Sequence, residues 1–411
     1  NMDQGNEKQR SVRHLGPNLT NALPFSSGSN VASEGRAVFE NHLPRSNRKH
    51  PFLIEQEQNV LNWPTETFSI DYYDKQNQRE YPHTVLLFVP GNPGCMGWYT
   101  DLIFSLVDRL GLGFAARGLS YAGHGINSKI ANVERWEHNE IPSDSSGENY
   151  RDVRIPWSVD GQIKHKIAWM DQVEVEMELL RRKRLASKTK STSSTSPRYI
   201  FISHSIGAHM VQRLSILRPD ILEKTILQIH LMPYIRTDAP QPQQGQLSVA
   251  ANAQSVVISI AKKMARIKSC LPLAASDFIM KGAVPDEKGR KLAVGIARQP
   301  HFARNFFELG LEEIRDVPEL PDDSALRLIG KICPIEMLYV GGPDHWAPPF
   351  HMDDLQQLRD RGSIPKSVNW TYMPELLHGF VVFPEMVPVV ADFCFQAICK
   401  VKGTTYLTSR L

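Results

Sequence analysis

Apolar runs alternate with amphipathic stretches along the chain, and this pattern predicts a parallel β-sheet covered by helices. The run Thr84–Pro90 is continuous in β-branched and apolar residues, which is typical of a strand buried on both faces. Residues 162–184 repeat apolar positions at spacings of three and four, which indicates an amphipathic helix. Strands that alternate with helices form a parallel sheet through right-handed crossovers. The expected strands are 67–72, 84–90, 113–120, 199–203, 225–230, 335–340 and 368–373.

The same pattern divides the chain into a tail, a core and an insertion. The first fifty or so residues are rich in Asn, Ser, Arg, His and Gly and bury too little apolar surface to offset the entropy of ordering. We therefore expect a disordered tail over 1–60, with order beginning near Thr65. Residues 65–232 and 332–400 carry the strand–helix alternation and form the expected core. Residues 233–331 interrupt the alternation and are interpreted as an insertion.

Composition removes several classes of protein from consideration. The 411 residues are 41% hydrophobic and 22% charged, as in chains that bury a core. The formal charge of +3 and the lack of a basic stripe argue against a nucleic-acid partner. Five scattered cysteines show no metal-ligand spacing and indicate reduced thiols in an intracellular protein. No apolar stretch is long enough for a membrane span, and no apolar region indicates a secretory signal.

The most informative segment is the Ser-His-Ser-Ile-Gly sequence of residues 203–207. A buried strand precedes it and a helical pattern follows it, which is the context of a nucleophile elbow. Such an elbow needs small residues two places before and after the nucleophile, because neighbouring backbone approaches closely there. Gly207 meets this need, and Ser203 replaces the commoner glycine. The segment therefore predicts Ser205 as a nucleophile.

An acid and a base follow Ser205 in the chain order that an α/β-hydrolase fold requires. Asp344 follows strand 335–340, and His378 follows strand 368–373. Active sites of open parallel sheets form at the carboxyl ends of strands, so these side chains are expected to meet. His345 is a weaker candidate for the base because it shares the loop of the acid. The fold class predicted is α/β, with a mostly parallel central sheet flanked by helices and a helical cap insertion.

Other acids and histidines receive less specific interpretations. Asp353 and Asp354 are expected on the surface of a helix. Structural or pocket-lining roles are expected for His124, His204, His209 and His230.

The glycine-rich loop 90–94 is expected to complete the oxyanion hole. Pro93 has no N–H group, so the backbone N–H of Asn92 is the predicted donor, paired with that of Ile206. An ordinary glycine-rich turn is the alternative interpretation of this loop. No metal or organic cofactor is required by this chemistry. The supporting positions are Gly91, Gly94, His204 and Gly207.

Four segments together resemble the lipid droplet-associated hydrolase family. They are 88–94, 160–166, 204–208 and 377–380, of which the Gly-Asn-Pro-Gly loop and the Gly-Gln-x-x-His-Lys segment discriminate best. The resemblance implies an intracellular hydrolase of lipid esters, found on lipid droplets and the endoplasmic reticulum. It also implies that the family's serine, acid and histidine fall on Ser205, Asp344 and His378.

The insertion and the reaction each leave alternatives open. Residues 248–267 combine an apolar helical face with a basic end, and 270–280 add apolar surface. This pattern fits a helix lying in a lipid interface, but it also fits a cap helix packed on the catalytic core. The favoured function is cleavage of carboxylic esters of lipids, such as sterol esters or acylglycerols, in lipid storage. The alternatives are a catalytically weak or inactive recruitment factor on the droplet, and a serine acyltransferase or thioesterase.

Overall fold

The structure is a computed structural model that describes much of residues 51–401. The gaps are 62, 74–78, 126–157, 188–195, 238–258, 343 and several positions between 261 and 320. Most of the amphipathic stretch 248–267 and the first fifty residues therefore lie outside the described residues. All five cysteines are free thiols. Within the described ranges, no helix is both long and apolar enough to cross a membrane.

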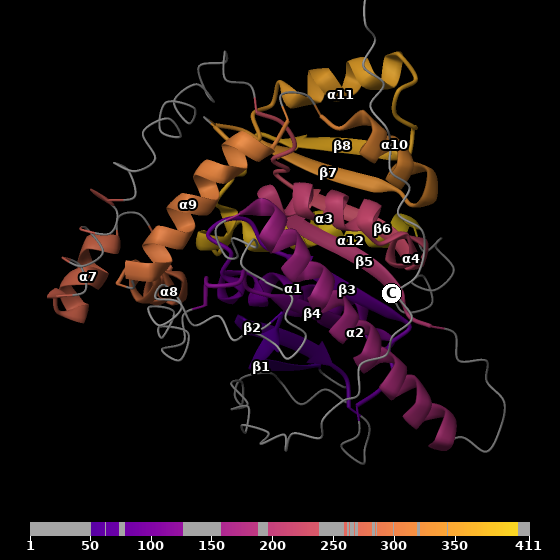
Figure 1. Ribbon diagram of the computed structural model, residues 1–411, viewed down its shortest axis with the longest axis horizontal. Helices are drawn as coiled ribbons and strands as arrows, with labels where there is room; N and C mark the ends of the chain where they lie inside the picture. The colour runs from indigo at the N-terminus through magenta and orange to yellow at the C-terminus, as the bar shows by residue number, and fades with distance from the viewer. Residues whose placement is uncertain are drawn as a thin grey trace, which may run out of the picture. The chain divides into compact units, whose positions relative to one another are not determined.

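The described residues form one eight-stranded sheet (Figure 1). Its strands are β1 (Phe52–Val60), β2 (Trp63–Asp71), β3 (Thr84–Val89), β4 (Phe114–Leu119), β5 (Arg198–His204), β6 (Thr225–Leu231), β7 (Ile335–Val340) and β8 (Val368–Met373). They are ordered β1-β2-β4-β3-β5-β6-β7-β8. The pairs from β4 to β8 are parallel, whereas β1 and β2 run antiparallel to their neighbours. This is the strand order of the α/β-hydrolase fold, and the predicted fold class is confirmed.

Helices cover both faces of the sheet because alternate residues of each buried strand point to opposite sides. On β3, Leu86 and Phe88 belong to one apolar cluster with residues of α1 (Thr100–Leu110) and α12 (Val387–Val401). Val85, Leu87 and Val89 belong to a second cluster with residues of α2 (Val159–Ser187) and α3 (Ile206–Leu217). The short elements α4 (Pro219–Lys224), α11 (His351–Asp360), η1 (Met96–Trp98) and η4 (Phe380–Val382) complete this part of the chain.

Strand β1 corrects the predicted extent of the tail. It pairs with β2 from Phe52↔Asp71 to Val60↔Trp63, so order begins well before Thr65. Its sequence, FLIEQEQNV, is largely polar, and most of its side chains are at least partly exposed. An edge strand of this kind is stabilised by its ladder of backbone hydrogen bonds, so its apolar pattern does not reveal it.

Three described helices lie wholly within the expected insertion, 233–331, and a fourth begins near its end. The three are α7 (Leu273–Met280), α8 (Glu287–Ala297) and α9 (Pro300–Asp316). Helix α8 packs on η1 and η4, and α9 packs on α2. The next helix, α10 (Asp323–Ile332), packs instead on α3 and α4.

Candidate active site

Ser205 stands in the tight turn between β5 and α3. Its backbone has φ 53° and ψ −127°, a region that residues other than glycine rarely occupy. Such strain persists only when the surroundings hold it in place. Here the N–H of Ser205 donates to the carbonyl oxygen of Leu231 at 2.9 Å, and its own carbonyl oxygen accepts from the N–H of Tyr234 at 3.1 Å. The strand–turn–helix geometry expected for residues 203–207 is therefore present.

The two small-residue positions of this turn have different surroundings. A Cβ on Gly207 would lie 2.6 Å from the carbonyl oxygens of Val89 and Pro90, so only glycine fits there. Ser203 has space for its hydroxyl, which is 2.7 Å from Nδ1 of His230 on the neighbouring strand. A serine in place of the commoner glycine is thus accommodated at position 203, where its hydroxyl has a buried hydrogen-bond partner.

Asp344 and His378 form a hydrogen-bonded pair at the ends of β7 and β8. Nδ1 of His378 lies 2.8 Å from Oδ2 of Asp344. The other carboxylate oxygen, Oδ1, accepts from the backbone N–H groups of Trp346 at 2.9 Å and Ala347 at 3.0 Å. Both oxygens are therefore occupied, and the carboxylate is fixed in the orientation that faces His378.

The environment of this pair favours an ionised carboxylate. Burial alone would raise the pKa of Asp344, but the charge of His378 and the hydrogen bonds from His378, Ala347 and Trp346 hold the pKa below its usual value. An ionised carboxylate only accepts, so Nδ1 of His378 carries the proton. In the neutral ring Nε2 is then the basic nitrogen. Asp344 thus pairs with His378, although His345 is next to it in sequence.

His204 connects the elbow to the loop of His378. Its Nε2 is 3.0 Å from the backbone oxygen of His378, and its Nδ1 is 2.8 Å from the hydroxyl of Tyr99. A carbonyl oxygen accepts, so Nε2 carries the proton and Nδ1 accepts from Tyr99. Burial, with the nearby His378, lowers the pKa of His204 to about 3 and keeps the ring neutral. The His204 and His378 rings are 4.9 Å apart, which places the predicted base beside the elbow.

The loop after β3 packs directly on Ser205. A Cβ on Gly91 would lie 2.8 Å from Cβ of Ser205. The loop is a turn closed by the N–H of Gly94, which donates to the carbonyl oxygen of Gly91 at 2.6 Å, and its Asn92-Pro93 peptide bond is cis. The N–H of Asn92 takes no part in that closing bond. Ile206 begins α3, so its N–H has no acceptor within the helix. Both predicted oxyanion donors therefore belong to segments that adjoin Ser205.

Comparison with known families matches residues 82–381 to a family described as lipid-droplet associated hydrolase. The chain belongs to this family. The matched range contains every predicted site residue and the whole insertion, whereas β1 and β2 precede it. The family resemblance expected from the sequence is confirmed, and the protein is a hydrolase.

Similar proteins include several that are named lipid droplet-associated hydrolase. The protein from Mus musculus is 24% identical over 326 residues, covering 78% of this chain and 87% of its own. The protein from Homo sapiens is 21% identical over 324 residues, with the same two coverages.

Solved structures with a similar fold are more distant in sequence. A peroxisomal α/β-hydrolase from Saccharomyces cerevisiae matches 85% of this chain and 90% of its own, with 13% identity and a TM-score of 0.47. A thermophilic esterase from Thermogutta terrifontis matches 84% of this chain and 98% of its own, with 14% identity and a TM-score of 0.45.

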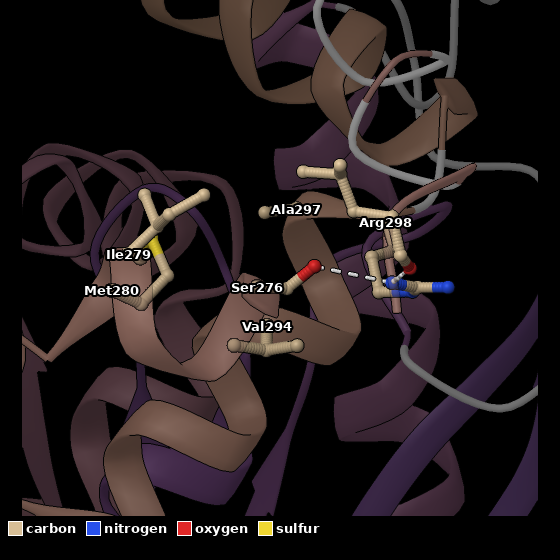
Figure 2. A pocket seen from close by; sticks show the side chains of 7 residues that line it. Ser276, Ile279, Met280, Val294, Ala297 and Arg298 are labelled. Atoms are coloured by element: carbon tan, nitrogen blue, oxygen red, sulfur yellow. Dashed lines mark hydrogen bonds between the residues drawn. The ribbon is translucent and has the colours of Figure 1, made fainter. Parts of the chain in front are cut away.

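A small apolar pocket of this family member lies in the insertion, between α7 and α8 (Figure 2). Arg298 closes one side by donating from Nη1 to the backbone oxygen of Leu271 at 2.5 Å and to Oγ of Ser276 at 3.1 Å. A second arginine, Arg290, donates to Asp277 at 2.8 Å. The pocket is lined by none of the predicted catalytic residues. Arg298 and Arg290 together tie α7 to the segment that contains α8.

Sequence reasoning missed two residues that contact the predicted site: Tyr99, which lies between η1 and α1, and Tyr121, which follows β4. Tyr99 supports His204, and the hydroxyl of Tyr121 donates to the backbone oxygen of Pro90. Neither residue belongs to a motif of fixed spacing with its partner. The one sequence signal nearby is the Gly-Gln-x-x-His-Lys segment, whose Lys166 lies over the ring of Tyr121.

Proposed function

We propose that this hydrolase cleaves carboxylic esters of lipids with Ser205 as nucleophile, His378 as general base and Asp344 as the orienting acid. The observation that carries the proposal is the combination of a strained serine at the β5–α3 turn with a hydrogen-bonded pair at the ends of β7 and β8, in which Asp344 is buried and His378 is partly exposed. A serine hydroxyl becomes a useful nucleophile when a base and an orienting acid accompany it.

The reaction proceeds in two steps of acyl transfer. Nε2 of His378 takes the hydroxyl proton as Oγ of Ser205 attacks the ester carbonyl. Asp344 stabilises the imidazolium that forms, and the N–H groups of Asn92 and Ile206 stabilise the oxyanion. Collapse of the intermediate releases the alcohol, which takes the proton from His378. Water activated by the same histidine then attacks the acyl-enzyme and releases the acid.

The test is covalent labelling of the folded protein with a fluorophosphonate, which reacts with activated serines. Wild type is expected to label, whereas Ser205→Ala and His378→Ala are expected not to. Ser203→Ala is the matched control, because it removes a neighbouring serine hydroxyl that bonds to His230 instead. Labelling that persists in Ser205→Ala, or a folded wild type that does not label, would refute the proposal.

A lipid substrate is supported by the family and by the surface of α7. Leu273 and Phe278 are 67% and 78% exposed, which is unusual for large apolar side chains in water. We propose that the exposed apolar side chains of α7 insert into the surface of a lipid droplet, or into the cytosolic face of the endoplasmic reticulum membrane. Sterol esters or acylglycerols of stored lipid would then reach Ser205 without crossing water.

We also propose that α7, α8 and α9 form the cap over the catalytic centre. The side chain of Asn92, in the predicted oxyanion loop, donates from Nδ2 to the backbone oxygen of Phe306 in α9 at 3.1 Å. Trp98 of η1 donates to the backbone oxygen of Gly289 in α8 at 3.3 Å. These contacts join the insertion to the segment between β3 and α1.

A further inference from the structure

The Gly-Gln-x-x-His-Lys segment has no part in the chemistry proposed above, yet the three polar side chains that define it, including that of His165, are buried. Gln162 and Lys166, both in α2, are almost fully buried. Oε1 of Gln162 accepts from the N–H of Ala122 at 3.2 Å, and its Nε2 donates to the carbonyl oxygen of the same residue at 3.1 Å. Nζ of Lys166 donates to Oε1 of Gln162 at 2.8 Å. The segment is therefore hydrogen-bonded to the backbone of Ala122, just after β4.

Tyr121 joins this buried cluster to the loop after β3. Nζ of Lys166 lies 3.8 Å from the centre of the Tyr121 ring. Burial lowers the pKa of Lys166, and both its charged and its neutral form have N–H groups to donate to Gln162. The hydroxyl of Tyr121 donates to the backbone oxygen of Pro90. Its backbone N–H donates to the oxygen of Gly94 at 2.8 Å.

Tyr121 thus contacts both ends of the loop 90–94. The ring also fills the space beside Gly94, where a Cβ would lie 2.5 Å from ring atoms. Between these two ends lies Asn92, the proposed oxyanion donor. A donor stabilises an oxyanion only when it lies within about 2.7–3.1 Å of the developing charge. If the loop were displaced by a fraction of that distance, the N–H of Asn92 would lose much of its stabilising effect on the oxyanion.

We propose that Tyr121, held by Lys166 and Gln162, is a positioning residue that sets the backbone N–H of Asn92 in the oxyanion hole. This inference rests on the proposed function and assigns a role to the segment that the reaction itself leaves unused. The positioning residue touches the loop backbone and not the substrate. Its removal should reduce the stabilisation of the transition state and leave the binding of the substrate in the ground state unchanged.

Removal of the Tyr121 hydroxyl should leave the loop attached. Nδ1 of His124 donates to the backbone oxygen of Pro93 at 2.7 Å, and Asn92 remains bonded to Phe306. The loop also keeps the backbone bond from residue 121 to Gly94, so it stays attached at three points in Tyr121→Phe. We expect this variant to fold, with the segment around Asn92 less well fixed.

The first experiment measures hydrolysis of a short p-nitrophenyl ester by Tyr121→Phe. We expect kcat to fall on the order of 10- to 100-fold with KM unchanged, because a small misplacement of a catalytic group has an effect of this size. A trifluoromethyl ketone, whose adduct with serine places an oxyanion in the hole, should lose affinity by the same factor as kcat/KM.

The matched control is Tyr72→Phe. Tyr72 is also a buried tyrosine whose hydroxyl donates to a backbone oxygen, that of Val107, at 3.1 Å. Each change removes one hydroxyl from one buried bond, so similar losses of thermal stability are expected. The control should keep kcat/KM and the affinity for the ketone within about twofold of wild type. The reason is that the bond between Tyr72 and Val107 does not involve the loop 90–94.

A second pair of variants covers the possibility that Tyr121→Phe does not fold. Lys166→Met removes the contacts to Tyr121 and Gln162 but keeps most of the side-chain volume. Lys164→Met, on the same helix, removes an exposed lysine that pairs with Asp160. The buried change should lower kcat and raise amide hydrogen exchange in peptides spanning 88–96, and the exposed change should do neither.

The outcomes separate this inference from the proposed function. An active wild type with Tyr121→Phe or Lys166→Met unchanged in kcat, ketone affinity and amide exchange would overturn the positioning role alone. A fall in kcat without the matching loss of ketone affinity would overturn it as well. A folded wild type that neither hydrolyses the ester nor binds the ketone would overturn the proposed function, and this inference with it.

Discussion

The end of the sheet around Ser205 and the surface of α7 are built on opposite principles. Around Ser205, polar side chains such as His204, Asp344 and Lys166 are buried and bonded to defined partners. On α7, the apolar side chains of Leu273 and Phe278 are exposed. Burying a polar group is costly unless it has hydrogen-bond partners. An exposed apolar side chain contributes stabilising free energy only when another apolar surface covers it. The first region is therefore complete within the chain, whereas the second is suited to an external apolar surface.

The largest effect should come from breaking the pair at the end of the sheet. Asp344→Asn keeps the shape of the side chain but removes the charge and presents an amide to His378. The histidine is then held in the wrong tautomer, and kcat is expected to fall about 10³- to 10⁴-fold. Steady-state ester hydrolysis measures this loss.

The control for this change is Asp354→Asn, which alters an acid on α11 that pairs with Arg236. Its kcat should stay close to that of wild type. If the two variants lose activity equally, Asp344 has no special role and the assignment of the acid is wrong.

A smaller effect is expected on the exposed surface. Replacing Leu273 and Phe278 with serine should weaken binding to phospholipid-coated triolein droplets about tenfold or more. Each large apolar side chain contributes about 1.5–3 kcal/mol when fully covered. Droplet flotation measures bound and free protein. Hydrolysis of a soluble ester should remain unchanged, since α7 contains none of the proposed catalytic residues.

The matched control places the same serines on α2. Val175 and Leu179 are 59% and 53% exposed, so they resemble the α7 pair in chemistry and in exposure. Val175→Ser and Leu179→Ser together should leave flotation unchanged. Equal loss in both double variants would mean that binding depends on general surface hydrophobicity rather than on α7.

The smallest effect concerns stability and pH at the buried end of the sheet. Burial lowers the pKa of His230 to about 3, whereas an unfolded histidine titrates near 6.5. Below that pH the unfolded chain binds more protons than the folded one. The contribution of His230 is thus complete above about pH 6.5 and falls by up to about 1.4 kcal/mol per pH unit as pH drops towards 3.

His230→Asn should therefore lose less stability than wild type between about pH 7 and pH 5. Thermal unfolding across that range measures the two slopes. Ser203→Ala removes the hydroxyl partner of the ring but retains the imidazole, so it should keep the slope of wild type. Identical slopes in wild type and His230→Asn would show that the histidine is not held neutral.

The sequence predicts the buried strands β3 and β7 but not the largely polar edge strand β1. The buried strands β3 and β7 were expected within a residue of their bounds because apolar runs at 84–90 and 335–340 define them. Strand β1 falls within the expected tail because its sequence, FLIEQEQNV, is largely polar. Its stability comes from backbone pairing with β2, which no local pattern records.

The site shows the same division. Ser205, Asp344 and His378 could be proposed because each follows a strand and their order along the chain is fixed by the fold. Tyr99 and Tyr121 could not, because their contacts with His204 and Pro90 join segments distant in sequence. Only tertiary packing brings such pairs together.

The most direct test of the central claim is to trap the acyl-enzyme. Wild type mixed with a p-nitrophenyl ester and quenched in acid within the first turnover should gain the mass of one acyl group. Peptide mapping should place that group on Ser205, and Ser205→Ala should gain none. An acyl group on Ser203, or release of product with no acylated serine at any time, would contradict the account.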